Sequence, residues 1–444
     1  MPEDRQLKVP SSDERPLYLQ LTHMYAPSWG YGGPVRLMSD YARWLNGAFR
    51  VLALSGDLHH DFTRIHAAHE DQDGVKVQRF RVHLPALARK SIYLVSPRMC
   101  LRAAALIRKS TASSVVHVTE LRGVIPLYAL FLKLLFGRRI FLVHSAFGGL
   151  HKKPGWRRKV FDAIFMKAFI RKIDLRLTQN DHEFGAYQTL CRTYGCVDNS
   201  KTILLPLHVD VQPLQDGHFG PTGKNREAVR ENRRKYGIPE DAVVFIFLGR
   251  LHPEKGILRM IDAHLEFSRR SRQRTLLLIV GRDDGFQARI EGYVREREIT
   301  DKVRIINGVY SERFHYYYLS DVFLGFPTIF EETMLASVEA LTCGTPIIVS
   351  READVPFVED EGAGRVLDFD VATAAATMLA FSLDLLPLQV KAREVALRHF
   401  RGCSVSQSLL HLLQKSMLVN NTNNLRDERK GETETDVFPV EASK

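Results

Sequence analysis

Short apolar segments alternate with longer helix-compatible segments along most of this chain, and the pattern runs through the chain twice. Strands that alternate with helices form a parallel sheet covered on both faces, because each connection must cross over the sheet. We therefore expect an α/β protein with two doubly wound domains in succession. The expected strands are residues 17–22, 50–54, 75–80, 114–118, 139–144, 175–178 and 203–205, and then 243–248, 276–280, 303–306, 321–326 and 346–350.

Polar and turn-rich segments mark the expected boundaries of these domains. A polar leader over residues 1–16 precedes a first domain over 17–207, and a linker over 208–224 leads to a second domain over 225–395. Residues 418–444 are too polar to pack and are expected to form a mobile tail. At about 150 residues per domain, the chain is long enough for two such domains.

Composition and the N-terminal sequence limit where such a protein would work. The chain is 45% apolar and 25% charged, as in ordinary folded proteins, and its five cysteines are too scattered for a disulfide framework or a zinc cluster. The leader lacks the apolar core of a secretory signal, and the longest apolar stretch, residues 123–136, is too short to span a bilayer. We expect a cytoplasmic protein that does not cross a membrane.

Positive charge is concentrated in one part of the chain. Residues 81–180 carry 20 Lys and Arg against three acidic residues, a net +17, whereas the whole chain carries +11 and the other 344 residues therefore −6. Such a region suits an anionic partner: nucleic acid, a phospholipid surface or a phosphorylated substrate. A solvated basic surface is the alternative. We expect no nucleic acid partner, because the chain has neither an RNA-binding aromatic motif nor zinc-finger spacing.

The segment GRLHPEKG, residues 249–256, stands where a buried strand ends and a helix begins. Ligands of doubly wound sheets bind outside the carboxyl ends of the strands. Arg250 and Lys255 lie five residues apart across this turn, so both cationic groups could reach one bound anion. A diphosphate suits them, since Arg offers forked donors and Lys a point charge. The alternative is an ordinary strand–turn–helix with two surface cations.

A second segment, FEETMLASVEALTCGTP over residues 330–346, carries two separated carboxylates. Glu331 precedes an expected helix start near Thr333, and Glu339 lies about two turns into that helix, roughly 9 Å along its axis. Free backbone amides over residues 333–336 would lie between them and suit an anion. The diphosphate of a nucleotide sugar, flanked by sugar and ribose hydroxyls, has matching parts. Two Glu on one helix are otherwise commonly solvated surface residues.

These two segments, in this order and about 80 residues apart, resemble the retaining glycosyltransferases of family 4, which have the GT-B fold. The resemblance covers residues 17–417 and is strongest over 225–370. It implies two Rossmann-like domains with a cleft between them, an N-terminal domain that binds the acceptor and a C-terminal domain that binds the nucleotide sugar. It also implies a closing helix over residues 396–417 that crosses back onto the N-terminal domain.

The resemblance assigns roles to residues of both motifs. Arg250 and Lys255 would stabilise the diphosphate leaving group, Glu331 would contact the donor sugar near its reacting carbon, and Glu339 would bind the ribose. The backbone amides of Met334 and Leu335 would add contacts to the diphosphate. The family often has Gly or Ser at the position of Met334, so this side chain must point away from the phosphates.

The N-terminal half offers further candidates. The loop GYGGP follows the first expected strand, and its glycines allow a backbone to approach a phosphate or sugar closely, although a plain turn is the alternative. Its position matches the family's loop over the diphosphate, which selects Gly32 and Gly33. His144 ends another expected strand, where a packed histidine is the ordinary finding, and it matches the family's His near the donor sugar. His117 is a lesser candidate.

Two other features bear on cofactors and partners. Asp-x-Asp pairs at 71–73 and 368–370 could hold a divalent ion, but neither lies beside the phosphate motifs, so we expect no metal and no cofactor. Residues 151–174 combine apolar residues at helical spacing with flanking cations. This favours a helix in an anionic membrane interface, or a core-facing helix with a basic outer face. Peripheral contact with the inner face of the membrane would follow from the first.

The function that these features and the resemblance imply is transfer of a hexosyl unit, with retention of configuration, from a UDP- or GDP-sugar to an acceptor hydroxyl. The acceptor would be a glycan or a lipid-linked molecule, in polysaccharide, lipopolysaccharide or glycolipid assembly. A basic protein that binds nucleic acid or a membrane is one alternative. An inactive transferase-like scaffold is the other, although Arg250, Lys255, Glu331 and Glu339 are all present.

Overall fold

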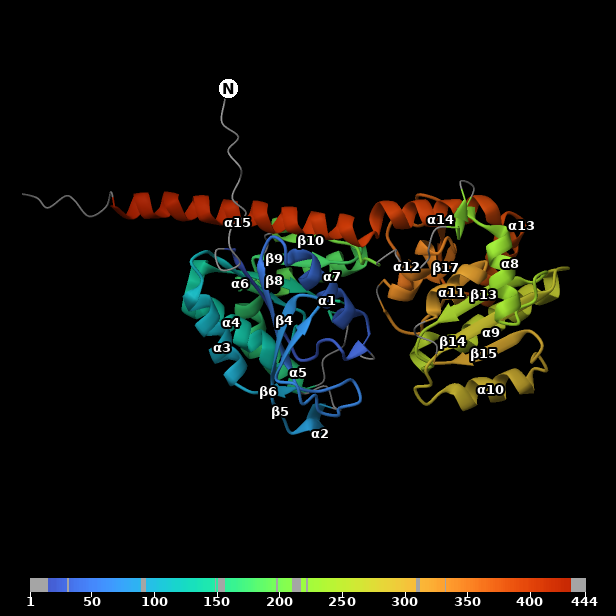
Figure 1. Cartoon of the computed structure of the whole chain (residues 1–444), viewed down its shortest axis with the longest axis horizontal. Helices are drawn as coiled ribbons and strands as arrows, with labels where there is room; N and C mark the ends of the chain where they lie inside the picture. The colour runs from blue at the N-terminus through green and yellow to red at the C-terminus, as the bar shows by residue number, and fades with distance from the viewer. Residues whose placement is uncertain are drawn as a thin grey trace, which may run out of the picture.

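Two separate sheets organise this protein, one in each half of the computed structural model (Figure 1). The structure describes residues 15–29, 32–88, 93–147, 149–150, 156–196, 199–209, 217–220, 223–308, 312–331 and 333–432.

The N-terminal sheet has the strand order β10-β9-β8-β7-β1-β2-β4-β3, and its neighbouring strands are parallel except for β3 and β4. From β1 the chain adds β2, β3 and β4 on one side of the sheet, and from β7 it adds β8, β9 and β10 on the other side. The strand order therefore reverses between β1 and β7. The strands are β1 (Leu17–Thr22), β2 (Arg50–Gly56), β3 (His69–Gln72), β4 (Val75–Phe80), β7 (Ser114–Val118), β8 (Ile140–Ser145), β9 (Leu175–Thr178) and β10 (Thr202–Leu204).

The central strands of this sheet are buried along their length, because helices cover both of its faces. A short hairpin of β5 (Val82–His83) and β6 (Leu94–Val95) lies outside it. The helices are α1 (Gly33–Leu45), α2 (Pro85–Ala88), α3 (Arg98–Lys109), α4 (Val124–Phe136), α5 (Trp156–Phe161), a π-helical turn η3 (Asp162–Met166), α6 (Lys167–Lys172) and α7 (Asp181–Thr193), with 3₁₀ turns η2 (Gly137–Arg139) and η4 (Asn199–Lys201).

The C-terminal sheet is parallel throughout, with the order β15-β14-β13-β16-β17-β18. Its strand order reverses between β13 and β16. The strands are β13 (Val243–Leu248), β14 (Thr275–Gly281), β15 (Val303–Asn307), β16 (Val322–Gly325), β17 (Ile347–Ser350) and β18 (Gly364–Leu367), preceded by a hairpin of β11 (Phe219–Gly220) and β12 (Gly223–Lys224).

Seven helices and two 3₁₀ turns accompany the C-terminal sheet in the described part of the chain. They are α8 (Arg226–Lys235), η5 (Pro253–Lys255), α9 (Ile257–Arg270), α10 (Gln287–Glu296), α11 (Arg313–Leu319), α12 (Leu335–Thr342), η6 (Arg351–Ala353), α13 (Val371–Leu383) and α14 (Leu385–His399). No single described helix is long and apolar enough to cross a membrane, and α13 with α14 reaches that length only as a pair bent by 98°.

The chain passes between the two halves twice, and the two passages lie side by side. Val209 N donates to Phe400 O at 2.9 Å, and Val209 pairs with Arg401 as an isolated parallel bridge. Helix α15 (Gly402–Glu432) then runs back along the N-terminal half (Figure 1), where Val405 and Leu409 pack in its core. A Cβ on Gly402 would lie 2.3 Å from the Trp44 ring, which shows how closely α15 approaches α1.

The α/β architecture predicted from the sequence is confirmed, and the C-terminal elements differ from the prediction in two places. The expected continuous helix over 396–417 is broken, because α14 ends at His399 and the pairing with Val209 takes its place before α15 begins. The tail expected from residue 418 is instead helical as far as Glu432, where α15 ends. A helix satisfies its own backbone hydrogen bonds and so tolerates a polar sequence. Residues 433–444 lie outside the described residues.

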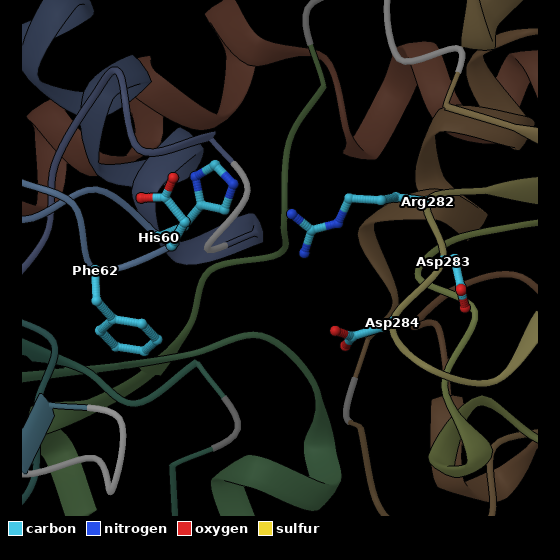
Figure 2. Close-up of a pocket in the computed structure, with 6 residues that line it drawn as sticks. His60, Phe62, Arg282, Asp283 and Asp284 are labelled. Atoms are coloured by element: carbon cyan, nitrogen blue, oxygen red, sulfur yellow. The ribbon is translucent and has the colours of Figure 1, made fainter. Parts of the chain in front are cut away.

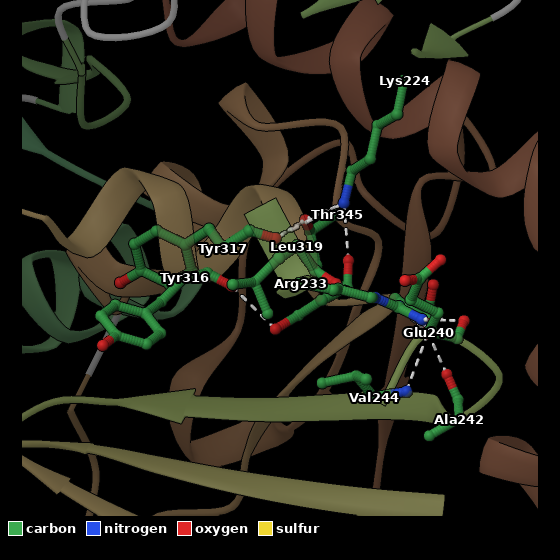
Figure 3. A network of polar contacts seen from close by, with 11 residues as sticks. Lys224, Arg233, Glu240, Ala242, Val244, Tyr316, Tyr317, Leu319 and Thr345 are labelled. Atoms are coloured by element: carbon green, nitrogen blue, oxygen red, sulfur yellow. Dashed lines mark hydrogen bonds and ion pairs between the residues drawn. The ribbon is translucent and has the colours of Figure 1, made fainter. Parts of the chain in front are cut away.

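The end of the predicted linker is built into the C-terminal half by a network of polar contacts (Figure 3). The buried Lys224 Nζ donates to Ser320 O at 2.6 Å and to Thr345 Oγ1 at 2.7 Å. Arg233 on α8 donates to Leu319 O at 2.9 Å and pairs with Asp321 at 2.8 Å. These bonds fix the hairpin and α8 against the segment that leads into β16.

The network makes stability depend on pH through Lys224. Burial lowers the pKa of Lys224 from 10.5 to about 7, while Asp321 opposes the shift. Between these values the unfolded chain binds a proton that the folded chain does not. The contribution of Lys224 to the free energy of unfolding therefore increases as the pH rises. We expect the stability of the wild type relative to Lys224→Met, measured by urea unfolding, to increase from pH 7 to pH 10. A constant difference would contradict the burial of a neutral Lys224.

Candidate active site

The first motif forms a rigid turn at the carboxyl end of β13. Gly256 has φ +66°, and a Cβ there would lie 1.8 Å from Phe326 O, so only glycine allows the turn to approach the loop that follows β16. Thr328 N donates to Glu254 O at 2.8 Å, and Arg259 Nη1 donates to Pro327 O at 2.9 Å. Since β13 and β16 are neighbours, these bonds join the two loops where the strand order reverses.

This junction brings Lys255 and Glu331 into contact. Lys255 Nζ lies 2.5 Å and 2.7 Å from the two carboxylate oxygens of Glu331, and both side chains are largely buried. Glu331 N donates to Glu352 O at 2.8 Å, which holds the carboxylate in place from the backbone. The two residues come from separate motifs, and a cation and an anion therefore stand side by side at the crevice where doubly wound sheets bind ligands.

Arg250 occupies the same edge of the sheet but is more exposed. Its Nη1 lies 2.5 Å from Asp284 Oδ2, a residue of the loop that follows β14. An exposed ion pair contributes about 0–1 kcal/mol, so an incoming anion can displace Asp284 at little cost. Asp284 is a neighbour of Arg250 that the sequence motifs do not identify.

The start of α12 offers an anion site between the two acidic residues. No described side chain caps its N-terminus, which begins at Leu335, so the positive end of the helix is available. Met334 precedes it, and a Cβ on Gly325 would lie 3.2 Å from the Met334 Sδ atom. The Met334 side chain is buried in the core, so it turns away from the helix end as expected.

Glu339 lies deeper, on α12, and is surrounded by donors. Arg36 Nη1 on α1 lies 2.6 Å from Glu339 Oε1, Arg313 Nε lies 2.9 Å from the same oxygen, and Tyr317 donates to Oε2 at 3.2 Å. Arg36 belongs to the N-terminal half, so the carboxylate joins the two halves. Any hydroxyl that binds Glu339 has to share it with, or displace, these donors.

The N-terminal half also contacts residues on both sides of Glu331. The ring of His182 on α7 stacks on Phe330 with centroids 3.7 Å apart. Asn180, the N-cap of α7, donates to Thr333 Oγ1 at 3.3 Å. The loop that carries Glu331 is thus held from the N-terminal half on both sides.

Cavities lie between the halves of the described structure. One of about 570 Å³ (Figure 2) opens between the loops that follow β2 and β14, and one of about 340 Å³ lies between α1 and the Glu339 region. Arg282 points from its loop toward the N-terminal half in Figure 2. The first is lined by His60, Asp61, Phe62, Arg282, Asp283 and Asp284, and the second includes Arg36, Asp40, Val209, Arg313 and Glu339. The carboxyl edges of both sheets therefore face a common cleft.

Gly32 and Gly33 begin α1 beside this cleft. Gly32 has φ +108°, and a Cβ on either residue would meet nothing within 4 Å. Glycine at position 32 is explained by its backbone conformation, and the space around both residues is open to a ligand.

His144 is placed differently from the other predicted residues. It is fully buried at the end of β8, Tyr187 contacts its Nδ1, and Phe169 packs edge-on against its ring. Burial lowers its pKa to about 4 against a smaller opposing effect of Glu120, so the imidazole is neutral at pH 7. All its described contacts lie in the N-terminal half, and the structure does not bring it together with Lys255. His117 is likewise buried between Tyr18 and Ser145.

A pair that the sequence motifs do not identify lies where the N-terminal strand order reverses. Glu120, after β7, accepts from His23 N at 2.9 Å and also contacts the His23 ring, which stacks on Tyr93. Burial raises the pKa of Glu120, but the contacts with His23 outweigh this and lower it overall. This ionised carboxylate therefore lies at the carboxyl edge of the N-terminal sheet.

The two Asp-x-Asp segments have structural explanations. Asp71 accepts from Gly74 N in the β3–β4 turn, and Asp370 caps α13 through Thr373 N. Among the described residues, no group of three or more His, Cys, Asp or Glu is arranged to hold a metal ion.

Comparisons with known proteins agree with this geometry. Residues 228–394 match the sequence profile of the family described as glycosyl transferases group 1. A D-inositol 3-phosphate glycosyltransferase of Corynebacterium efficiens is 30% identical over 209 residues, which are 44% of this chain and 49% of that protein. The chain thus spans about half the length of the curated relatives it matches.

Solved structures resemble the fold over nearly the whole chain. Anabaena Alr3699/HepE in complex with UDP and glucose has a TM-score of 0.66 at 14% identity, covering 90% of this chain and all of that one. Sucrose-phosphate synthase from Thermosynechococcus elongatus has a TM-score of 0.66 at 17% identity, covering 91% of this chain and all of that one. The chain therefore has the GT-B fold of two Rossmann-like domains, and its residues 228–394 are similar to the glycosyl transferases group 1 family.

Proposed function

We propose that this protein is a retaining glycosyltransferase that moves a hexosyl unit from a nucleoside diphosphate sugar to an acceptor hydroxyl. The observation that carries the proposal is the contact of Lys255 with Glu331 at the reversal point of the C-terminal sheet, beside Arg250 and the uncapped start of α12. The match of residues 228–394 to the glycosyl transferases group 1 profile and the similarity to a curated glycosyltransferase support it.

The proposed order of contacts gives the donor one orientation along this edge of the sheet. Its diphosphate would lie against Lys255, Arg250 and the amides of Met334 and Leu335, after Asp284 releases Arg250. Its ribose would reach Glu339, where it takes the place of Arg36 or Arg313. The sugar would then lie beside Glu331, under the backbone of Gly32 and Gly33.

The reaction separates charge, and the site has a group for each charge. Cleavage of the glycosidic bond places negative charge on the diphosphate, which Lys255, Arg250 and the helix amides stabilise without reorganising. Glu331 favours the positive charge that develops on the sugar ring. The acceptor oxygen would attack from the face that the phosphate leaves, and the leaving phosphate would take the acceptor proton. This scheme retains configuration and needs neither a covalent intermediate nor a metal ion.

The acceptor is proposed to approach from the N-terminal domain. Glu120 and His23 stand at its reversal point and can accept or donate hydrogen bonds to a polyol. We propose a glycan or a lipid-linked acceptor in polysaccharide, lipopolysaccharide or glycolipid assembly at the cytoplasmic side of the membrane. His144 would support this region from within the core, because it is buried and neutral.

Nucleotide binding provides the direct test. Saturating UDP or GDP is expected to raise the melting temperature by about 5 °C or more, because a ligand at 100 times its Kd stabilises by about 2.7 kcal/mol. UDP is the first choice, since the similar structure of HepE contains it. Glu339→Gln should lose most of this shift, whereas Glu394→Gln, an exposed residue of α14, should keep it.

The same protein should then release nucleoside diphosphate from one donor sugar in a panel, in the presence of EDTA. An inactive scaffold would bind a nucleotide without releasing product. A nucleic-acid-binding protein would instead bind random-sequence nucleic acid with a steep dependence on salt. No shift with any nucleotide would contradict the proposed function.

A further inference from the structure

Three helical segments form one outer layer of the N-terminal domain. Helix α4 packs against α3 and α6, and Figure 1 shows α3 and α4 on the side away from the C-terminal domain. Large apolar side chains point outward from it. Leu101, Phe131, Leu134, Leu135 and Ile164 are between 53% and 68% exposed.

On α4 the exposed apolar residues follow helical spacing. Phe131, Leu134 and Leu135 lie on one face of its last turns, and the exposed Arg138 and Arg139 follow directly. On α3, Leu101 is also an exposed apolar residue. The apolar positions are therefore concentrated rather than scattered singly, and a concentrated patch on a protein surface indicates an interaction site.

Residues 151–174, which were predicted from sequence to contact a membrane, add only one face to this outer layer. Met166, Phe169 and Ile170 are buried in the domain core, so part of its apolar pattern belongs to the fold. Val160 and Ile164 remain exposed on the outer face. Residues 151–155 lie outside the described residues.

The same layer is strongly and uniformly basic. Arg98, Arg102, Arg108 and Lys109 are exposed on α3, and Lys159, Lys167, Arg171 and Lys172 are exposed on α5 and α6. None of these eight forms an ion pair with a described residue. Only two acidic residues occur between positions 98 and 172, and both are largely buried, Glu120 against His23 and Asp162 against Arg122.

We propose that this layer, formed by α3, α4 and the segment from α5 to α6, docks on an anionic lipid bilayer. Cations attract anionic headgroups, and the exposed apolar side chains enter the boundary between headgroups and acyl chains. A second copy of the chain is disfavoured, because it would bring the same uncompensated cations face to face. A purely electrostatic partner such as nucleic acid leaves the exposed Phe131, Leu134 and Leu135 unexplained.

Sedimentation with lipid vesicles tests the proposal. The full chain is expected to bind phosphatidylcholine vesicles containing phosphatidylglycerol about tenfold or more tightly than vesicles of phosphatidylcholine alone. Lys167→Glu combined with Arg171→Glu, and separately the triple change Phe131→Ser, Leu134→Ser and Leu135→Ser, should each weaken binding about tenfold.

A matched control comes from the other domain. Leu383 on α13 is 77% exposed, so Leu383→Ser changes a comparable apolar residue on a different surface and should bind vesicles like the wild type. Unchanged circular dichroism and an unchanged UDP-induced melting shift would show that the surface variants are folded. Equal binding to both kinds of vesicle, or full binding by the triple variant, overturns the proposal. A dimer of the wild type that the triple variant converts to a monomer also overturns it, in favour of self-association.

Discussion

Lys255→Ala is expected to lower turnover by at least about 100-fold, the effect of removing one key donor to a charged transition state. Lys255 is the cation that the structure holds against Glu331, at 2.5 Å, where the two loops of the C-terminal domain meet. In the proposed reaction the charge that develops on the diphosphate would then lack this fixed cation, and Glu331 loses the group that orients it. Turnover is measured as release of nucleoside diphosphate.

Glu254→Ala is the matched control, because it changes the adjacent, exposed side chain and leaves the backbone bond from Thr328 N to Glu254 O in place. It should keep near-normal turnover. Lys255→Ala should still fold, since the turn is held by backbone bonds, but at a lower melting temperature, because the largely buried Glu331 carboxylate loses its cation. Near-normal turnover in Lys255→Ala would remove this residue from the mechanism.

Gly256→Ala is expected to have a comparably large effect by a different route. Its Cβ would lie 1.8 Å from Phe326 O, in a backbone conformation at φ +66° that alanine adopts only with strain. The loops after β13 and β16 must then separate, which moves Lys255 away from Glu331. We expect a loss of about 2–4 kcal/mol of unfolding free energy and a fall in turnover of about 100-fold, measured by urea unfolding and by product release.

Gly292→Ala provides the comparison. Gly292 lies within α10, and a Cβ there meets nothing within 4 Å, so this change should leave turnover unaltered and raise stability by about 0.5–1 kcal/mol. If Gly256→Ala proved as harmless as Gly292→Ala, the close approach of the two loops would be wrong.

Strands with a continuous or a regularly alternating apolar pattern could be predicted well. Residues 17–22, 75–80 and 243–248 were expected as strands and form β1, β4 and β13 with the same bounds. Strand β18 has the sequence GRVL, in which Arg365 interrupts the apolar run, so no pattern distinguishes it from a loop. The hairpin strands are two residues long, too short for any periodicity.

The site could be predicted in part, because its motifs are local. Arg250, Lys255 and Glu331 follow strands whose carboxyl ends share an edge, and this can be read from the order of elements. Arg36 and Asp284 could not be predicted in the same way, since their contacts with Glu339 and Arg250 join residues 303 and 34 positions apart. Such pairs depend on how two domains or two loops meet, which the spacing of a single motif does not record.

The two chain segments that connect the domains pair with each other at Val209 and Arg401, so they form one hinge rather than two independent connections. Val209 also lines the smaller cavity beside Glu339, whereas the larger cavity of Figure 2 does not include it. A rotation of one domain about this hinge would therefore move the walls of the smaller cavity least. It would carry Phe62 and Arg282 through a wider arc, so the larger cavity would open while the Glu339 carboxylate stayed close to Arg36.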